Sequence, residues 1–162
     1  MEFVAELYRE QVDGGRYFLH EHRLYASSWG IPAIEAIRKM TGVQRVHGDQ
    51  CQFGAEVGDG PATGQPVKKP SGFMTNSACI ATALIRTRQG TRGLCSRPKG
   101  SRHEPCSGKV AATAQVYPRS LCRAVLKGAT NQLKTDGLLK DGCYGIHMAD
   151  DDMEVLKSMF GR

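Results

Sequence analysis

Two cysteines and one histidine stand close together in a stretch rich in glycine and arginine. Cys95, His103 and Cys106 follow the pattern C-x7-H-x2-C. Thiolate sulfur and imidazole nitrogen are preferred ligands of zinc, and ligands at such short separations can surround one tetrahedral ion. A closed site needs a fourth ligand, for which the more distant candidates are Cys51, Cys79, Cys122 and Cys143. The pattern therefore predicts zinc as a cofactor, and unrelated thiols beside a surface histidine remain the alternative.

Glu21 is the carboxylate whose position favours catalysis. The residues from Arg16 to Glu21 predict a short buried strand that ends at the glutamate. In an open α/β sheet, ligands bind beyond the carboxyl ends of the strands, so Glu21 is expected to face a site there as an acid or base. His20 and His22 flank it. Because alternate residues of a strand share a face, the histidines should point together and away from Glu21, which disfavours a metal site of all three.

The stretch over residues 86–109 is strongly basic and is opposed only by Glu104. The residues predicted to bind nucleic acid are Arg86, Arg88, Arg92, Arg97, Lys99 and Arg102. Such side chains neutralise phosphates and release counterions, which is the main sequence-independent source of affinity for DNA or RNA. No aromatic residue interrupts the stretch, which argues against a base-stacking platform within it. A solvated loop is the alternative interpretation.

Alternating helical and extended patterns surround these residues. Helices are predicted over residues 1–14, 32–40 and 78–85 and from Pro118 onward, and strands over 16–21, 43–47 and 72–76. Ser28 is the expected cap of the second helix. The buried faces of the first and last helices should use Phe3, Leu7 and Tyr8, and Leu121, Cys122, Val125 and Leu126. This order predicts a layered α/β sheet, and three strands amount to about half of such a domain.

Two long segments lack any periodic apolar pattern and are predicted to be glycine-rich loops, at residues 48–70 and 86–108. The expected domain therefore covers residues 1–128, with the basic Cys/His loop at 86–109, and a weakly structured extension covers residues 129–162. The first of these loops contains no phosphate-binding motif, and the chain contains neither a dinucleotide fingerprint nor a G-x-S-x-G elbow.

Composition restricts the class of protein further. The chain has 162 residues, a net charge of +6 and a pI of about 9.1, which is compatible with an acidic partner such as nucleic acid and equally with a merely basic soluble protein. Its longest apolar run is far short of the roughly 20 residues that span a bilayer, so no membrane partner is expected. Six cysteines are too few for a secreted disulfide scaffold of this length. With no signal-peptide pattern at Met1, the expected location is cytoplasmic or nuclear, with reduced thiols.

Five segments together resemble a segment carried in the polyproteins of Copia-type retrotransposons. They are GGRYFLHEH at 14–22, DQCQFG at 49–54, KPSGFMTNS at 69–77, CSRP at 95–98 and YPRSLCRA at 117–124, within a resemblance that spans roughly residues 3–128. Those polyprotein segments are similar in turn to the second half of cytosine-5 DNA methyltransferase domains. The resemblance implies a partial Rossmann-like three-layer sheet, with Glu21 in the place of the strand-end glutamate that holds the cytosine ring. It also implies that residues 53–69 correspond to a basic motif that supports the site.

This chain departs from the methyltransferase pattern at its most important parts. The Pro-Cys turn that carries the nucleophile and the loop that binds S-adenosylmethionine would both precede residue 1. Arg88 stands where the similar polyproteins carry a cysteine, which would complete the pattern C-x6-C-x7-H-x2-C. The resemblance thus implies a truncated, inactive methyltransferase-like domain of a retroelement polyprotein with residual nucleic-acid binding, and with other parts of the polyprotein as further partners. Two alternatives stay open: a small zinc-dependent nucleic-acid-binding module, and an intact enzyme that uses Glu21.

Overall fold

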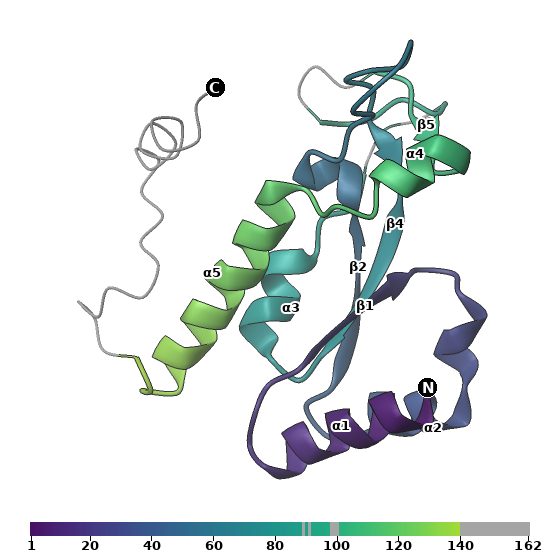
Figure 1. Cartoon of the computed structure of the whole chain (residues 1–162). Coiled ribbons are helices and arrows are strands. Elements are labelled where there is room, and N and C mark those ends of the chain that lie inside the picture. The colour runs from purple at the N-terminus through teal and green to yellow at the C-terminus, as the bar shows by residue number, and fades with distance from the viewer. Residues whose placement is uncertain (89, 91, 98–100, 140–162) are drawn as a thin grey trace, which may run out of the picture.

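The chain folds into a mixed α/β structure with a small sheet between helices. The structure is a computed structural model, and it describes residues 1–88, 90, 92–97 and 101–139. Two pairs of helices pack against the sheet, and the long glycine-rich segments gather at its upper end (Figure 1). The expected α/β class is therefore confirmed.

The main sheet has three strands, and its pairing is antiparallel throughout. The strands are β1 (Leu19–Arg23), β2 (Gln44–Asp49) and β4 (Pro70–Thr75), in the order β1-β4-β2. β1 and β2 run in the same direction, but β4 lies between them and runs the opposite way. The strands predicted over 43–47 and 72–76 are confirmed. In an open parallel sheet, the carboxyl ends of neighbouring strands lie side by side and form the ligand site. No two neighbouring strands of this sheet are parallel, so it has no such pair of adjacent carboxyl ends.

Glu21 lies in the middle of β1, so the prediction that it ends a strand is wrong. The extended segment before β1 does not join the ladder, because the side chain of Asn76 holds it. Its carboxamide oxygen accepts the backbone N–H of Phe18 at 3.0 Å, and its amide donates to the carbonyl of Arg16 at 2.8 Å. Pairing with β4 begins only at Leu19 and continues beyond the glutamate.

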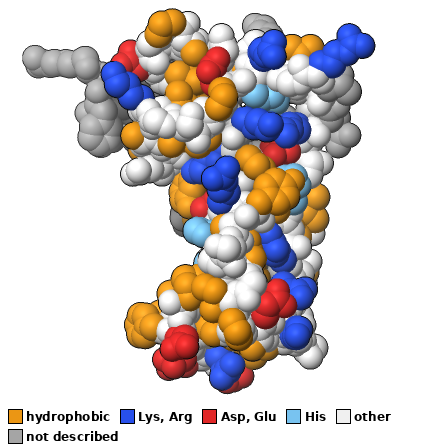
Figure 2. All heavy atoms as spheres, turned by 90° about the vertical axis from the view of Figure 1, so that its right-hand side faces the viewer, with side chains coloured by type: hydrophobic (Ala, Val, Ile, Leu, Met, Phe, Trp, Pro, Cys, Tyr) orange, Lys and Arg blue, Asp and Glu red, His pale blue; other side chains and the backbone are white. Residues whose placement is uncertain are grey.

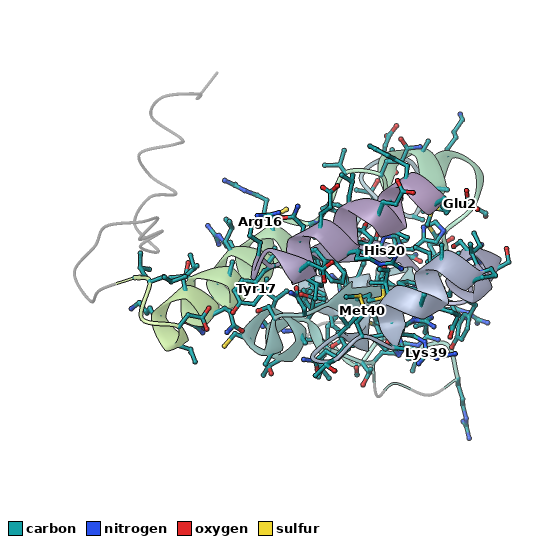
Figure 3. All side chains as sticks on the ribbon, turned by 90° about the horizontal axis from the view of Figure 1, so that it is seen from below. Glu2, Arg16, Tyr17, His20, Lys39 and Met40 are labelled. Carbon is teal, nitrogen blue, oxygen red and sulfur yellow. The ribbon has the colours of Figure 1, made fainter. Side chains whose placement is uncertain are left out.

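One face of the sheet is covered by α1 (Glu2–Asp13), the 3-10 turn η1 (Ser27–Gly30) and α2 (Pro32–Arg38). The core on this side consists of Ala5, Phe18, Trp29, Ile34, Ile37 and Met74. His20 and Met40 lie in the layer between α1 and α2 (Figure 3). The rings of His20 and His22 both contact Trp29, so the two histidines share this face as predicted.

Three expectations about this face are wrong. Phe3 is 69% exposed and Leu7 is 39% exposed, because α1 turns Ala5, with Tyr8 beside it, toward the sheet. Ser28 does not cap α2, since the N-cap position belongs to Ile31 and makes no side-chain bond. The fixed backbone angle of Pro32 suits the first turn of a helix and starts α2 without a polar cap.

The opposite face of the sheet is covered by α3 (Ala78–Leu84) and α5 (Arg119–Thr135). Their shared core consists of Phe53, Phe73, Ile80, Leu84, Leu121 and Ala124. α3 begins as predicted, with the Ser77 hydroxyl accepting the N–H of Ile80 at 3.2 Å. α5 is rotated from the predicted face: Leu121 is buried, but Cys122 and Leu126 are exposed and Val125 is only partly buried.

One glycine and one buried glutamine explain the rotation of α5. Gly128 faces α3 so closely that a Cβ atom there would lie 2.7 Å from the Cα of Ile80. One turn later, the buried Gln132 accepts hydrogen bonds from the Ser77 hydroxyl at 2.9 Å and from the N–H of Cys79 at 3.2 Å. Apolar periodicity does not assign a glycine or a glutamine to the core, so the buried face predicted for α5 was wrong.

The two long loops contain short elements that pack on one another. These elements are η2 (Gln50–Phe53), β3 (Val67–Lys68), β5 (Glu104–Pro105) and α4 (Gly108–Thr113). β3 and β5 pair in parallel, and Ala55, Val57 and Val67 form a third small core beside them. This packing brings residues 48–70 against residues 86–108, which the sequence did not indicate.

The boundary expected after residue 128 falls inside α5, which continues to Thr135. Most of the expected C-terminal extension, residues 140–162, lies outside the described residues.

The contact between α3 and α5 leads to a stability prediction. Gly128→Ala should lower the free energy of unfolding by about 1–2 kcal/mol, because overpacking against the α3 backbone outweighs the gain in helix propensity. Gly58→Ala is the control, since Gly58 has no atom within 4 Å of its would-be Cβ and an ordinary φ. Urea unfolding of both variants measures the difference. Equal stabilities would show that the two helices do not approach so closely.

Candidate functional site

Cys51, Cys95 and His103 come together at the upper end of the sheet. One ligand atom from each lies within 4.8 Å of the other two. Cys51 comes from η2, directly after β2, whereas Cys95 and His103 come from the basic loop. Their exposed fractions are 1%, 7% and 9%, so the group is shielded from solvent. Three ligand atoms from two distant segments therefore meet in a buried site.

The histidine is oriented for ligation through Nε2. Its Nδ1 lies 2.9 Å from the carbonyl oxygen of Gly93, which can only accept, so Nδ1 carries the proton. The other ring nitrogen, Nε2, faces Cys51 Sγ at 3.4 Å. The backbone fixes this arrangement, because the N–H of His103 donates to the same Gly93 carbonyl and the N–H of Cys95 donates to Ser101. A hydrogen bond from the second ring nitrogen is the usual support of a metal-bound histidine.

The side-chain amide of Gln52 lies within hydrogen-bonding distance of both sulfur atoms. Its Nε2 lies 3.7 Å from Cys51 Sγ and 3.5 Å from Cys95 Sγ, within reach of a donated hydrogen bond. Burial, followed by the neighbouring Cys95, raises the pKa of Cys51 to about 11. The free thiol is therefore neutral at pH 7. A bound metal ion reverses this preference, because a coordinating thiol is deprotonated.

Two thiols and one imidazole fit the donor set of zinc with three protein ligands, in which the fourth position is left to water or another group. Among the described residues, no other histidine, cysteine or carboxylate joins the group as a fourth ligand. Position 88 lies close by in the fold. The N–H of Arg88 donates to Asp49 at 2.8 Å, two residues before Cys51, and the N–H of Asp49 donates to Arg86.

The predicted ligand set is thus corrected at one position. Cys95 and His103 are brought together, but Cys51 stands with them in place of Cys106. Strand β5 lies between His103 and Cys106, and in a strand those two positions point to opposite sides. Cys106 packs instead against the small core beside β3. Among the other candidates, Cys79 and Cys122 lie on α3 and α5, and Cys143 is outside the described residues.

Glu21 is held in a network of hydrogen bonds on the α5 side of the sheet. Its Oε1 accepts from the Ser71 hydroxyl at 2.6 Å and from the amide of Gln50 at 3.3 Å. Its Oε2 accepts from the Tyr117 hydroxyl at 2.7 Å. The amide of Gln50 also donates to Ser71 at 2.8 Å, so the two donors of Oε1 support each other.

Tyr117 ties the segment before α5 to the sheet through this carboxylate. Burial, and then the hydrogen bond to Glu21, raise the pKa of Tyr117 to about 12, so the phenol remains a neutral donor. The ammonium of Lys69 lies 5.3 Å from the centre of its ring and donates to the carbonyl of Ala114 at 2.7 Å. Both oxygens of the Glu21 carboxylate accept hydrogen bonds, so this side chain links β1 to β4 and to the segment before α5.

The basic residues of the predicted nucleic-acid site have different roles. Arg92 and Arg102 are exposed, on backbone segments joined by a bridge between Leu94 and Arg102. Arg86 is also exposed and lies 4.9 Å from the ring of Phe53, while Arg88 is partly buried.

Arg97 is tied into the protein and is not a free cation. Its side chain, 14% exposed, pairs with Glu56 at 2.7 Å and donates to the carbonyl of Gly64 at 3.1 Å. It fastens the basic loop to residues 48–70. Lys99 lies outside the described residues.

Comparisons with protein-family models, curated proteins and solved structures found no match to this chain. No helix in the described part of the chain is long and apolar enough to cross a membrane.

The metal site can be tested by exchanging one ligand. The purified chain should hold about one zinc ion, and Cys51→Ser should lose it, because only two protein ligands would remain. Cys106→Ser is the matched control and should keep the metal, since the structure places that thiol elsewhere. Elemental analysis after dialysis decides between them. Zinc lost from Cys106→Ser and kept by Cys51→Ser would restore the ligand set predicted from the sequence.

The bond between Tyr117 and Glu21 should give a pH-dependent contribution to stability. The folded pKa of Tyr117, about 12, lies above its ordinary value of 10.0, so the contribution is complete below pH 10 and is lost as the pH rises toward 12. Below pH 10, Tyr117→Phe should cost about 1 kcal/mol, since the half-exposed hydroxyl weakens a charge-assisted bond.

Denaturant unfolding between pH 8 and pH 12 measures this difference. Tyr25→Phe, at a tyrosine that is 80% exposed, is the control and should match the wild type at every pH. A constant difference between wild type and Tyr117→Phe across this range would contradict the assignment.

Proposed function

We propose that this chain is a nucleic-acid-binding module without catalytic activity, and that a zinc ion at Cys51, Cys95 and His103 orders its basic loop. The observation that carries the proposal is the meeting of these three ligand atoms within 4.8 Å. Nucleic-acid binding without catalysis comes from the first interpretation of the sequence. Dependence on zinc comes from its alternative.

The metal would link the sheet to the loop that carries the cations. Cys51 follows β2, whose end is fixed by Asp49, while Cys95 and His103 flank residues 96–102. Structural zinc with four protein ligands contributes on the order of 10–16 kcal/mol in finger peptides, and an ion with the three protein ligands found here would add part of that to the few backbone bonds that join the two arms of this loop. Zinc would therefore hold Arg92 and Arg102 at defined positions on the surface.

Phosphate is the ligand that these exposed cations favour. Arg92 and Arg102 lie on adjoining arms of the loop, and the chain as a whole carries a net charge of +6. Guanidinium groups bind phosphate oxygens with two parallel hydrogen bonds and release counterions from a nucleic acid. The partner in this proposal is DNA or RNA, recognised through its backbone.

We further propose that the scaffold is a remnant of the methyltransferase-like, Rossmann-like domain in the polyproteins of Copia-type retrotransposons. The support is that the resembling segments meet in space: Glu21, Gln50, Ser71 and Tyr117 come from four of them and form one network. A cytoplasmic or nuclear location, and contacts with other parts of such a polyprotein, belong to the same proposal. The chain alone should transfer no methyl group from a labelled donor to DNA, and transfer abolished by Glu21→Gln would favour the intact-enzyme alternative.

Nucleic-acid binding can be measured with a fluorescein-labelled single strand. We expect affinity to fall steeply with salt and the joint change Arg92→Ala and Arg102→Ala to reduce the log–log salt slope by about 1.4, or roughly 0.7 per phosphate contact on a single strand. Removing zinc with a chelator should weaken binding as well.

The control removes the same charge elsewhere. Arg9 lies on α1 and Arg16 follows its end, and Figure 1 shows α1 at the lower end of the molecule, opposite the end that carries β5. Changing both to alanine should leave the slope nearly unchanged. Equal effects of the two double variants would mean that net charge, rather than this loop, binds the nucleic acid.

A further inference from the structure

The turn after β1 presents an aromatic ring to solvent. Tyr25 is 80% exposed, so its ring is accessible to a ligand from solvent. It lies in a turn closed by the N–H of Ala26 donating to the carbonyl of Arg23 at 3.1 Å. Tyr25 is a lining residue of two surface hollows.

The turn itself is firmly held. The indole N–H of Trp29 donates to the carbonyl of Arg23 at 2.8 Å, and the guanidinium of Arg45 donates to the carbonyl of Leu24. Arg45 also stacks 4.1 Å above the Trp29 ring, and the N–H of Leu24 continues the pairing with β4 at Pro70. The Tyr25 ring therefore projects from a backbone that needs little ordering when a ligand binds, which lowers the entropic cost of binding.

Both hollows are lined by cations. The first, about 490 Å³, is lined by Arg23 and Lys68 and by the rings of Pro70 and Pro105, with no carboxylate among its described lining residues. The second, about 660 Å³, is lined by the cations Arg38 and Arg45, and its one carboxylate, Glu35, is paired with Arg38 at 2.8 Å. Volumes of this size are typical of ligand pockets.

The first hollow also reaches the basic loop. Pro105 and Cys106 of that loop form part of its wall. The stretch over 86–109 contains no aromatic residue, but the fold brings Tyr25 next to it. Figure 2 shows this side of the molecule, where lysine and arginine side chains are spread from top to bottom among apolar ones.

We propose that Tyr25 is a stacking platform for a base of single-stranded nucleic acid, with Arg23 and Lys68 binding the adjoining phosphates. An exposed ring between cations matches the alternation of base and phosphate in a single strand. A duplex hides the faces of its bases, so it would engage only the cations. The proposal rests on the proposed nucleic-acid-binding function and adds to it the strandedness of the ligand and a second surface.

The test compares two strands of equal length and charge, an oligothymidylate and the same backbone with abasic sites. The wild-type chain should bind the base-bearing strand roughly 5- to 150-fold more tightly, the range expected for one stacked base. Tyr25→Ala should abolish this preference and leave affinity for the abasic strand unchanged. Tyr25→Phe should keep the preference, because the stacking ring remains.

A double variant tests the cations. Changing Arg23 and Lys68 to alanine together should weaken binding of both strands and reduce the log–log salt slope by about 1.4, or roughly 0.7 per contact on single strands. Because Tyr25 is exposed, replacing it should not disturb the fold. Tyr25→Phe is the control for any change in affinity that comes from misfolding.

The possible failures can be told apart. If Tyr25→Ala keeps the preference for bases while the Arg92 and Arg102 variant loses affinity, the stacking platform is wrong and the nucleic-acid module stands. If the wild type binds neither strand, both proposals fail. A polyglutamate peptide could also displace the strands. If the wild type and Tyr25→Ala bind this peptide with equal affinity, the partner is an acidic protein and the stacking platform is wrong.

Discussion

The structure depends on one constraint, the burial of β4 on both faces and along both edges. All of its residues from Ser71 to Thr75 are buried, and its backbone pairs with β1 on one side and β2 on the other. Phe73 points into the core under α3 and α5, and Met74 points into the core under α1 and α2. A strand surrounded in this way leaves its backbone groups no access to water, so both neighbours must pair with it. The two helical layers pack on opposite faces of this central strand.

The same strand organises the chemistry at the upper end of the molecule. Ser71, near its start, donates to Glu21 of β1, and the preceding Lys69 contacts Tyr117. On the other edge, β2 leads through the buried Asp49 into η2 and Cys51. The glutamate network and the candidate metal site are therefore built at the end of one rigid sheet. Polar groups placed in this way are well ordered because their supporting backbone is already fixed.

The two glycine-rich segments gain their order from each other rather than from local propensity. β3 and β5 contribute only two residues each, and the pair from Arg97 to Glu56 joins the same two segments. An ion pair of this kind adds modest stability when one partner is half-exposed, as Glu56 is. A metal ion that binds one ligand from the first segment and two from the second would be a much stronger link. Such an ion would stabilise the two segments whether or not it affects the binding of nucleic acid.

By itself the sequence determined the α/β class, two of the three main strands, the start of α3 at Ser77 and the shared face of His20 and His22. These follow from local rules, in which periodicity, caps and alternation act over a few residues. It also indicated that Cys95 and His103 could bind a metal. Only the tertiary structure decided that Cys51 completes the group, because contacts between residues some 40 positions apart leave no local pattern. The antiparallel insertion of β4, the inward face of Gly128 and Gln132, and the place of Tyr25 beside the basic loop were decided in the same way, by packing between segments distant in the chain.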